Sequence, residues 1–174
     1  MRTNADTTMA KLISADLTNN KLCILEYTTN DRQRLWIKPD AFDADIVSHT
    51  YIDIGRIIFK KPITKISDNV FNKCYNLKGI TIPNSVTTIG NNAFYNCKSL
   101  SHLTIGKNVA KIGYNGFKGC SNVNMIICRA TAPPKLSYNS WDITPSCIER
   151  FETLVVPTGC EEVYANSDWG KYLK

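Results

Sequence analysis

The chain has 174 residues, with 21 basic and 15 acidic side chains, a net charge of +6 and 43% hydrophobic residues. This length allows one domain with a sizeable core, and no apolar run approaches the roughly 18 residues that a membrane-spanning helix needs. The lysines are scattered rather than gathered on one predicted element. We therefore interpret the positive charge as a solubilising surface and expect no nucleic-acid partner.

The N-terminal segment precedes any regular pattern. Residues 1–8 are polar and lack the apolar core of a secretory signal, so no signal peptide is predicted within this chain. Apolar residues at helical spacing follow at 9–17, and two alternatives stay open: a short docked helix or a mobile tail. Residues 22–27 and 35–37 are strand candidates on either side of a turn. We expect them to form a hairpin that covers the N-terminal end of the core.

From residue 61 onward the sequence repeats with a period of 23 residues. An aromatic residue, a cysteine, an isoleucine and an asparagine each recur in register over three units. The four sets are Phe71, Phe94 and Phe117; Cys74, Cys97 and Cys120; Ile66, Ile89 and Ile112; and Asn69, Asn92 and Asn115. The same phase places the strand of a preceding coil at 57–59. Such regularity predicts a solenoid of stacked coils.

One unit indicates how a coil is built. Residues 77–82 alternate apolar and other side chains, which is typical of a half-buried strand, and Pro83 ends that strand. Residues 86–89 fit a second short extended stretch, and residues 91–97 suit one helical or 3₁₀ turn that places Phe94 in the core. A lone coil cannot bury its apolar side. Stacked coils cover one another, so each buried Ile, Leu or Phe contributes roughly 1.5–3 kcal/mol.

The seven cysteines favour structure over chemistry. No C-x-x-C pair occurs, which argues against a zinc knuckle or a redox motif. Stacking places the three repeated cysteines in one column with parallel side chains, so we expect buried reduced thiols there. The pattern leaves open whether Cys128, Cys147 or Cys160 forms a disulfide.

The period fails in the C-terminal part of the chain. Trp141 falls one position past the aromatic residue expected at 140, and residues 153–157 restore a strand that ends in proline. Residues 158–161 match a T-x-x-E capping box, so a short helix should follow. Two aromatic side chains are expected to close this end: Trp169 and Tyr172.

Together these elements predict an α/β solenoid of the leucine-rich-repeat type. We expect a short right-handed superhelix with a parallel sheet on one face, an N-terminal β-hairpin cap and a short C-terminal helix. The chain should form a single domain over residues 1–174. Its parts are an N-terminal cap at 1–55, regular coils at 56–128, and an irregular last coil with the C-terminal cap at 129–174.

No catalytic or metal-binding constellation is predicted. The chain has two histidines, which rules out a site of three imidazoles within it, and His102 lies at a strand position that points away from the buried thiols. No phosphate-binding loop or nucleophile elbow occurs. Asp43 and Asp45 lack the glycine and glutamate that an EF-hand would need, and a solvated capping loop explains them. We therefore expect no cofactor, no metal and no enzymatic activity.

The outward face of the predicted sheet is the candidate binding surface. By register, the side chains that flank the middle core position form two rows across the coils. The rows are Arg56, Gly79, His102, Met125 and Thr153, and Ile58, Thr81, Thr104, Ile127 and Val155. Met125, Ile127 and Val155 form an exposed apolar patch, which indicates a contact surface unless residues 130–150 cover it. Both alternatives stay open.

Residues 80–97, Ile-Thr-Ile-Pro-Asn-Ser-Val-Thr-Thr-Ile-Gly-Asn-Asn-Ala-Phe-Tyr-Asn-Cys, resemble one unit of the BspA-like bacterial leucine-rich repeats. Residues 41–51 resemble the lead-in to such an array, and residues 128–134 with 154–160 resemble its end. The resemblance covers roughly residues 20–174. It implies a secreted or cell-surface bacterial protein, and a role in adhesion to host matrix proteins or to other cells.

Two functions are consistent with these expectations. The first is a non-enzymatic module that binds a protein, peptide or carbohydrate through its sheet face, as a monomer or weak oligomer. The alternative is a structural or self-associating scaffold with no ligand of its own. A five-stranded face measures about 300 Å², well below the roughly 800 Å² per partner of a standard interface. Such a face alone should not hold a folded partner tightly.

Overall fold

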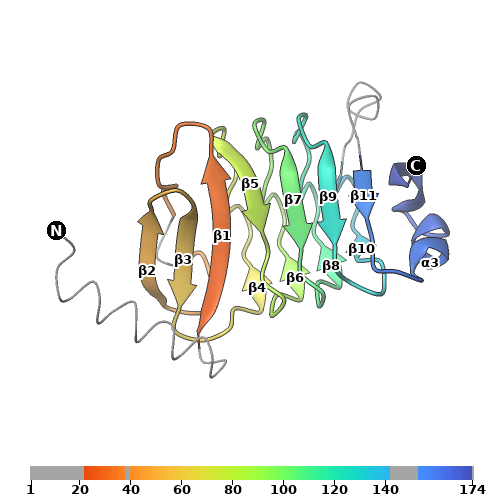
Figure 1. Ribbon diagram of the computed structural model, residues 1–174, viewed down its shortest axis with the longest axis horizontal. Coiled ribbons are helices and arrows are strands. Elements are labelled where there is room, and N and C mark those ends of the chain that lie inside the picture. Colours follow the sequence, from red (N-terminus) through yellow and green to blue (C-terminus); the bar gives the residue numbers. More distant parts are fainter. Residues whose placement is uncertain (1–21, 38–39, 142–152, 174) are drawn as a thin grey trace.

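The computed structural model describes residues 22–37, 40–141 and 153–173, and the helix expected at 9–17 lies outside them. The described chain winds between two sheets (Figure 1). The main sheet contains β1 (Cys23–Thr29), β2 (Ile46–Tyr51), β3 (Gly55–Phe59), β5 (Leu77–Thr81), β7 (His102–Ile105), β9 (Met125–Cys128) and β11 (Thr153–Val155). The second sheet contains β4 (Lys65–Ile66), β6 (Thr88–Ile89), β8 (Lys111–Ile112) and β10 (Lys135–Leu136).

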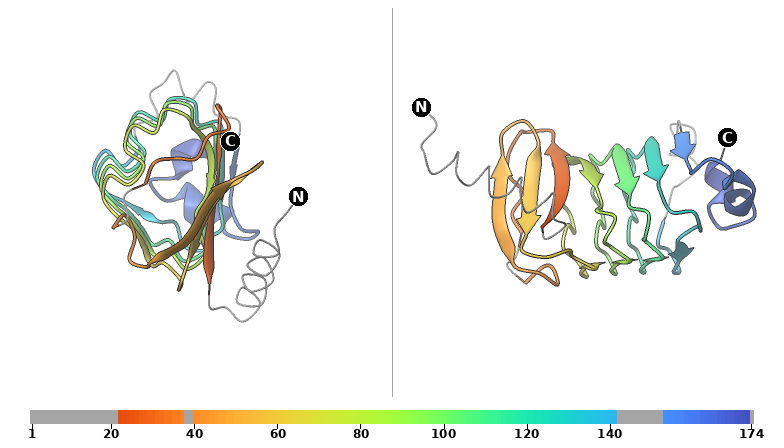
Figure 2. Two further views of the ribbon diagram at one scale, coloured as in Figure 1. Left: turned by 90° about the vertical axis from the view of Figure 1, so that its left-hand side faces the viewer. Right: turned by 60° about the horizontal axis from the view of Figure 1, so that its bottom comes forward.

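The coils stack in register, one repeat apart. Within the main sheet, Gly79 pairs with His102 and His102 pairs with Met125 in parallel strands, and the coils superimpose when viewed along the solenoid axis (Figure 2, left). Turns, not helices, join the two sheets, and α3 (Glu161–Ala165) is the one α-helix in the described part of the chain. The protein is therefore a β-solenoid, which corrects the predicted α/β class.

The repeated asparagines have a backbone role. Asn69, Asn92 and Asn115 adopt positive φ angles of 63°, 52° and 53°. This left-handed region is costly for most side chains, but asparagine tolerates it. The resulting turn directs alternate N–H groups at the next coil, and the N–H of Phe71 donates to the carbonyl of Ala93 at 2.8 Å. The asparagine period therefore marks a conformational requirement of each coil.

A column of aromatic rings fills the core beneath these turns. The rings of Phe71 and Phe94 stack with centroids 4.9 Å apart, and those of Phe94 and Phe117 with centroids 4.7 Å apart. Trp141 continues the column at 4.5 Å from Phe117. The solenoid accommodates the extra residue before Trp141 without losing its pairing. Strand β10 still pairs with β8, with Leu136 opposite Ile112.

The repeated thiols line the same core. The thiol of Cys97 donates to the carbonyl of Phe71 at 3.0 Å, and that of Cys120 donates to the carbonyl of Phe94 at 3.0 Å. Both cysteines are buried and free. Burial, together with the neighbouring Cys97, raises the pKa of the Cys74 thiol to about 12, so this thiol stays protonated. The expectation of buried reduced thiols is confirmed for Cys97 and Cys120, whereas Cys74 is free but only half-buried.

The predicted N-terminal hairpin is wrong. Residues 35–37 form no strand, and β1 instead lies between β3 and β5, antiparallel to both. The hairpin at this end joins β2 and β3 through residues 52–54. Leu35 is buried but pairs with no strand. The apolar residues at 35–37 therefore indicate packing against the core and not a β-strand. The strand predicted at 57–59 exists, but β1 separates it from the first regular coil.

Residues 42–45 cover the free edge of the second sheet. Phe42 forms an isolated bridge with Ile66 and its ring packs on Phe59 at 4.7 Å. The carboxylate of Asp43 accepts hydrogen bonds from the backbone N–H and the hydroxyl of Thr64. Burial raises the pKa of Asp43, but the bonds from Thr64 and from the backbone of Lys65 and Asp43 together lower it more, so the pKa lies below its ordinary value. A capping role for this loop is confirmed.

Aromatic residues also close the C-terminal end. Trp169 is fully buried, its ring lies 5.8 Å from that of Trp141, and its indole N–H donates to the carbonyl of Pro134 at 2.8 Å. The hydroxyl of Tyr164 donates to the carbonyl of Ala130 at 2.7 Å. The helix α3 begins after Cys160, which makes no side-chain capping bond. The predicted T-x-x-E capping box is therefore wrong.

His49 makes a half-buried contact between the N-terminal strands. Its Nε2 lies 2.6 Å from the hydroxyl of Tyr27, and that hydroxyl oxygen accepts the N–H of Leu35. The Tyr27 hydroxyl therefore joins the imidazole of His49 to the backbone of Leu35. Burial, and to a lesser extent the charge of Arg34, lowers the pKa of His49 to about 4.

Truncating the middle of the aromatic column should destabilise the whole solenoid. We expect Phe94→Ala to lower the free energy of unfolding by about 3–5 kcal/mol, because it leaves a cavity between two stacked rings. Tyr75, which is 52% exposed, provides the control, and Tyr75→Ala should change stability by no more than about 0.5 kcal/mol. Urea denaturation followed by circular dichroism measures both. Equal effects would contradict the column as the core of the fold.

Stability should fall in mild acid because of His49. Its pKa is 6.5 ordinarily and about 4 in the folded protein, so the unfolded chain binds more protons between these values. The free energy of unfolding therefore decreases as pH falls through this range. His49→Gln keeps a hydrogen-bonding partner for Tyr27 and should reduce the loss between pH 7 and about pH 4.5, measured by urea midpoints. His102→Gln is the control and should retain the wild-type loss.

Candidate functional site

The outward face of the main sheet brings most predicted site residues together. His102, Met125 and Thr153 lie level on adjacent strands. Thr81, Thr104, Ile127 and Val155 form a second level row, as the repeat predicted.

Insertion of β1 displaces the two N-terminal members of these rows. Arg56 pairs with Glu26, and Glu26 pairs with Thr81, so Arg56 is level with the threonine row and not with Gly79. Ile58 pairs with Ile24 and is 6% exposed. The predicted positions of Arg56 and Ile58 are therefore corrected, because the 23-residue phase cannot account for a strand that enters from another part of the chain.

A shallow hollow of about 290 Å³ lies where β1, β5 and β7 meet. Gly79 forms its floor, since a Cβ there would lie 2.9 Å from the hydroxyl oxygen of Thr28. His102 flanks the hollow, and its Nδ1 lies 2.7 Å from the hydroxyl of Ser101. On the far side, the carboxylate of Glu26 forms an ion pair with Arg56, with Nε and Oε1 2.9 Å apart. The hollow thus combines a small floor with hydroxyl, imidazole and charged side chains.

The C-terminal part of this face is apolar. Met125 and Ile127 are half-buried, and Val155 is 45% exposed. The segment predicted as a possible cover is residues 130–150. Its part up to residue 141 contributes β10 to the second sheet and forms no strand of the main sheet. Its remaining part, 142–150, lies outside the described residues. Within the described chain, the apolar side chains adjoin the polar hollow on one continuous sheet surface.

Other chemistry is scarce in the described ranges. No group of three or more His, Cys, Asp or Glu side chains there has the geometry to hold a metal ion. No helix among those residues is long and apolar enough to cross a membrane. Burial also raises the pKa of the Cys128 thiol, which accepts a hydrogen bond from Tyr164 at 3.1 Å.

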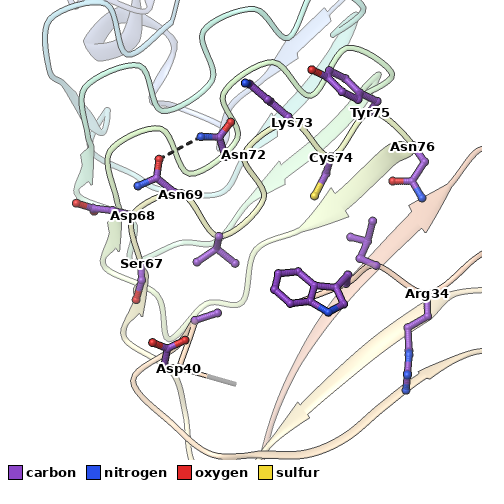
Figure 3. A pocket seen from close by; sticks show the side chains of 14 residues that line it. Arg34, Asp40, Ser67, Asp68, Asn69, Asn72, Lys73, Cys74, Tyr75 and Asn76 are labelled. Atoms are coloured by element: carbon purple, nitrogen blue, oxygen red, sulfur yellow. Dashed lines mark hydrogen bonds between the residues drawn. The ribbon is translucent and has the colours of Figure 1, made fainter. Parts of the chain in front are cut away.

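A second hollow, of about 960 Å³, opens beside the turn of the first regular coil (Figure 3). The turn, residues 67–76, forms one wall, and the segment around Trp36 forms another. Trp36 is 77% exposed. In Figure 3 the side chains of Asn69 and Asn72 lie along the turn, and Asn72 Nδ2 donates to Asn69 Oδ1 at 3.1 Å.

Sequence reasoning missed this second hollow. The signal that could have indicated it is the start of the regular repeat, because the first unit of an array has no preceding unit to cover its turn. The sequence predicts a strand at 35–37. The structure instead places Trp36, with an exposed side chain, in the wall of this hollow. The sheet-face rows, in contrast, follow directly from the period.

Comparison with known proteins gives one match. The family model described as the BspA type leucine rich repeat region matches residues 46–166, with six copies. Neither a curated protein sequence nor a solved structure matches the chain significantly. The matched range includes β2 to α3 and therefore every regular coil. The chain belongs to the BspA-type leucine-rich-repeat family.

Proposed function

We propose that this protein is a non-enzymatic interaction module that binds a protein or glycan through the outward face of its main sheet. The observation that carries the proposal is the continuity of that face, from the hollow at Gly79 to the apolar side chains around Ile127. The central strands exchange their backbone hydrogen bonds with one another. Side chains are therefore what this face presents to a partner.

The dimensions of the face favour weak or multivalent binding. Seven strands at about 4.8 Å spacing and four residues at about 3.3 Å rise give roughly 440 Å². Standard interfaces bury roughly 800 Å² per partner. The insertion of β1 enlarges the face beyond five strands, yet it remains too small for tight binding of a folded partner. An extended peptide or an oligosaccharide suits it better, as does avidity from many copies at a surface.

Membership of the family supports adhesion at a bacterial cell surface as the biological setting of this binding. The alternative is a structural scaffold that associates with itself. The half-exposed Val155 and its apolar neighbours would serve either role, since an apolar patch binds a second copy as readily as another partner. Light scattering over a range of concentrations separates the two, and a concentration-independent monomer would remove self-association.

Charge placed on the face should weaken binding strongly. The triple variant His102→Asp, Met125→Asp and Ile127→Asp puts three carboxylates on adjacent strands, and we expect at least a tenfold loss of affinity from desolvation and repulsion. Immobilised matrix proteins and a glycan array serve as probes. For every probe that the wild-type protein binds, the affinity of the triple variant is compared with that of the wild type.

A control with the same charge change tests whether position matters. Thr87→Asp, Ala110→Asp and Ala132→Asp alter exposed residues close to the second sheet. This variant should bind like the wild type, and both variants should show the wild-type circular dichroism spectrum. If the sheet-face variant retains binding, the contact lies elsewhere and the proposal is wrong.

A further inference from the structure

The first regular coil, residues 61–82, has three edges that a preceding coil would cover. The edge of β5 pairs with β1. The edge of β4 is covered by Phe42 and by Asp43, whose carboxylate accepts the N–H of Thr64. The third edge is the turn at 67–76, and it lines the 960 Å³ hollow. Two edges are thus capped by described residues, and the turn faces a hollow.

The repeat shows which atoms the turn presents to that hollow. Alternate N–H groups of each turn donate to carbonyls of the next: Asn69 to Asn91, Phe71 to Ala93, and Lys73 to Tyr95, at 2.7–3.0 Å. The following pair of turns makes the same three bonds: Asn92 to Tyr114, Phe94 to Gly116, and Asn96 to Lys118, each at 2.8 Å. One period earlier, the equivalent acceptors are the carbonyls of Asp68, Val70 and Asn72.

No described residue donates to those three carbonyls. The wall of the hollow is therefore a row of acceptors at alternate residues. Such a row is complementary to a chain that offers N–H groups at the same spacing.

We propose that this open turn is a docking groove for a polypeptide segment of a partner, bound through three backbone N–H groups at residues i, i+2 and i+4. The segment takes the place that a preceding turn would occupy. Charge does not select the partner, because the walls include both Arg34 and Lys73 and both Asp40 and Asp68. Backbone hydrogen bonding, with Trp36 as an apolar wall, sets the affinity.

The repeat also specifies the sequence of the segment. The first and third donors of a turn have positive φ: 63° at Asn69 and 59° at Lys73, and 52° at Asn92 and 57° at Asn96. Asparagine or glycine therefore suits those two positions. The middle donor must be small, because Phe42 already lies against Phe71, with ring centroids 6.2 Å apart. The preferred pattern is Asn-x-Ala-x-Gly.

A display library tests this pattern against the full chain. The residues Asn-x-Ala-x-Gly are fixed, and x and the flanks are randomised. A matched library carries Phe in place of Ala. We expect at least tenfold stronger enrichment from the Ala library, because a Phe side chain would collide with Phe42. A selected peptide N-methylated at the three donors should bind at least tenfold more weakly than its parent, measured by calorimetry.

Protein variants locate the site of the selected peptide. Trp36→Ala should weaken binding several-fold, whereas Tyr138→Ala, at an 80% exposed ring remote from the groove, should not. Retention of binding by the triple sheet-face variant distinguishes this groove from the face of the proposed function. Failure of the Ala library to enrich, equal binding of the N-methylated peptide, or loss of binding in the sheet-face variant would each overturn the proposal.

Discussion

Every coil of this protein is completed by its neighbour. The alternate N–H groups of one turn bond to the carbonyls of the next, as at Phe71 and Ala93, and the ring of one coil packs on the ring of the following coil. Unpaired backbone groups and half-covered apolar rings are both costly when buried. The period of 23 residues keeps the hydrogen bonds and the aromatic column in register together, and the one extra residue before Trp141 is accommodated without breaking either. The architecture follows from this mutual dependence.

The same dependence makes the two ends the places where the sequence departs from the repeat. At the C-terminal end, the column finishes in Trp141 and Trp169, and Tyr164 supplies a hydroxyl to the carbonyl of Ala130. At the N-terminal end, an antiparallel strand pairs with β5, and Asp43 supplies carboxylate oxygens where a preceding coil would supply a carbonyl. Each cap replaces one kind of contact that a further coil would have made. Such caps do not need the repeated sequence pattern, because each one covers a single edge of the solenoid only once.

The sequence predicted what the repeat controls and missed what the caps control. The burial of Phe94, the reduced thiol of Cys97 and the level rows on the sheet face all follow from one period. The insertion of β1 does not, because Glu26 meets Arg56 and Thr81 across long stretches of chain that carry no common pattern. Leu35 shows the converse error. Its apolar neighbourhood is read locally as a strand, yet its burial comes from tertiary packing against the core.

The binding surfaces inherit this division. The sheet face presents side chains, because the ladders consume its backbone groups, and its chemistry varies from Gly79 to Ile127 as the repeat allows. The open turn presents backbone carbonyls, because no described residue takes the place of the preceding turn that would use them. A partner at the sheet face is therefore selected by side-chain shape and polarity, whereas a partner at the turn is selected by chain geometry. Both surfaces arise where stacking stops, one along the sides of the coils and the other at the start of the array.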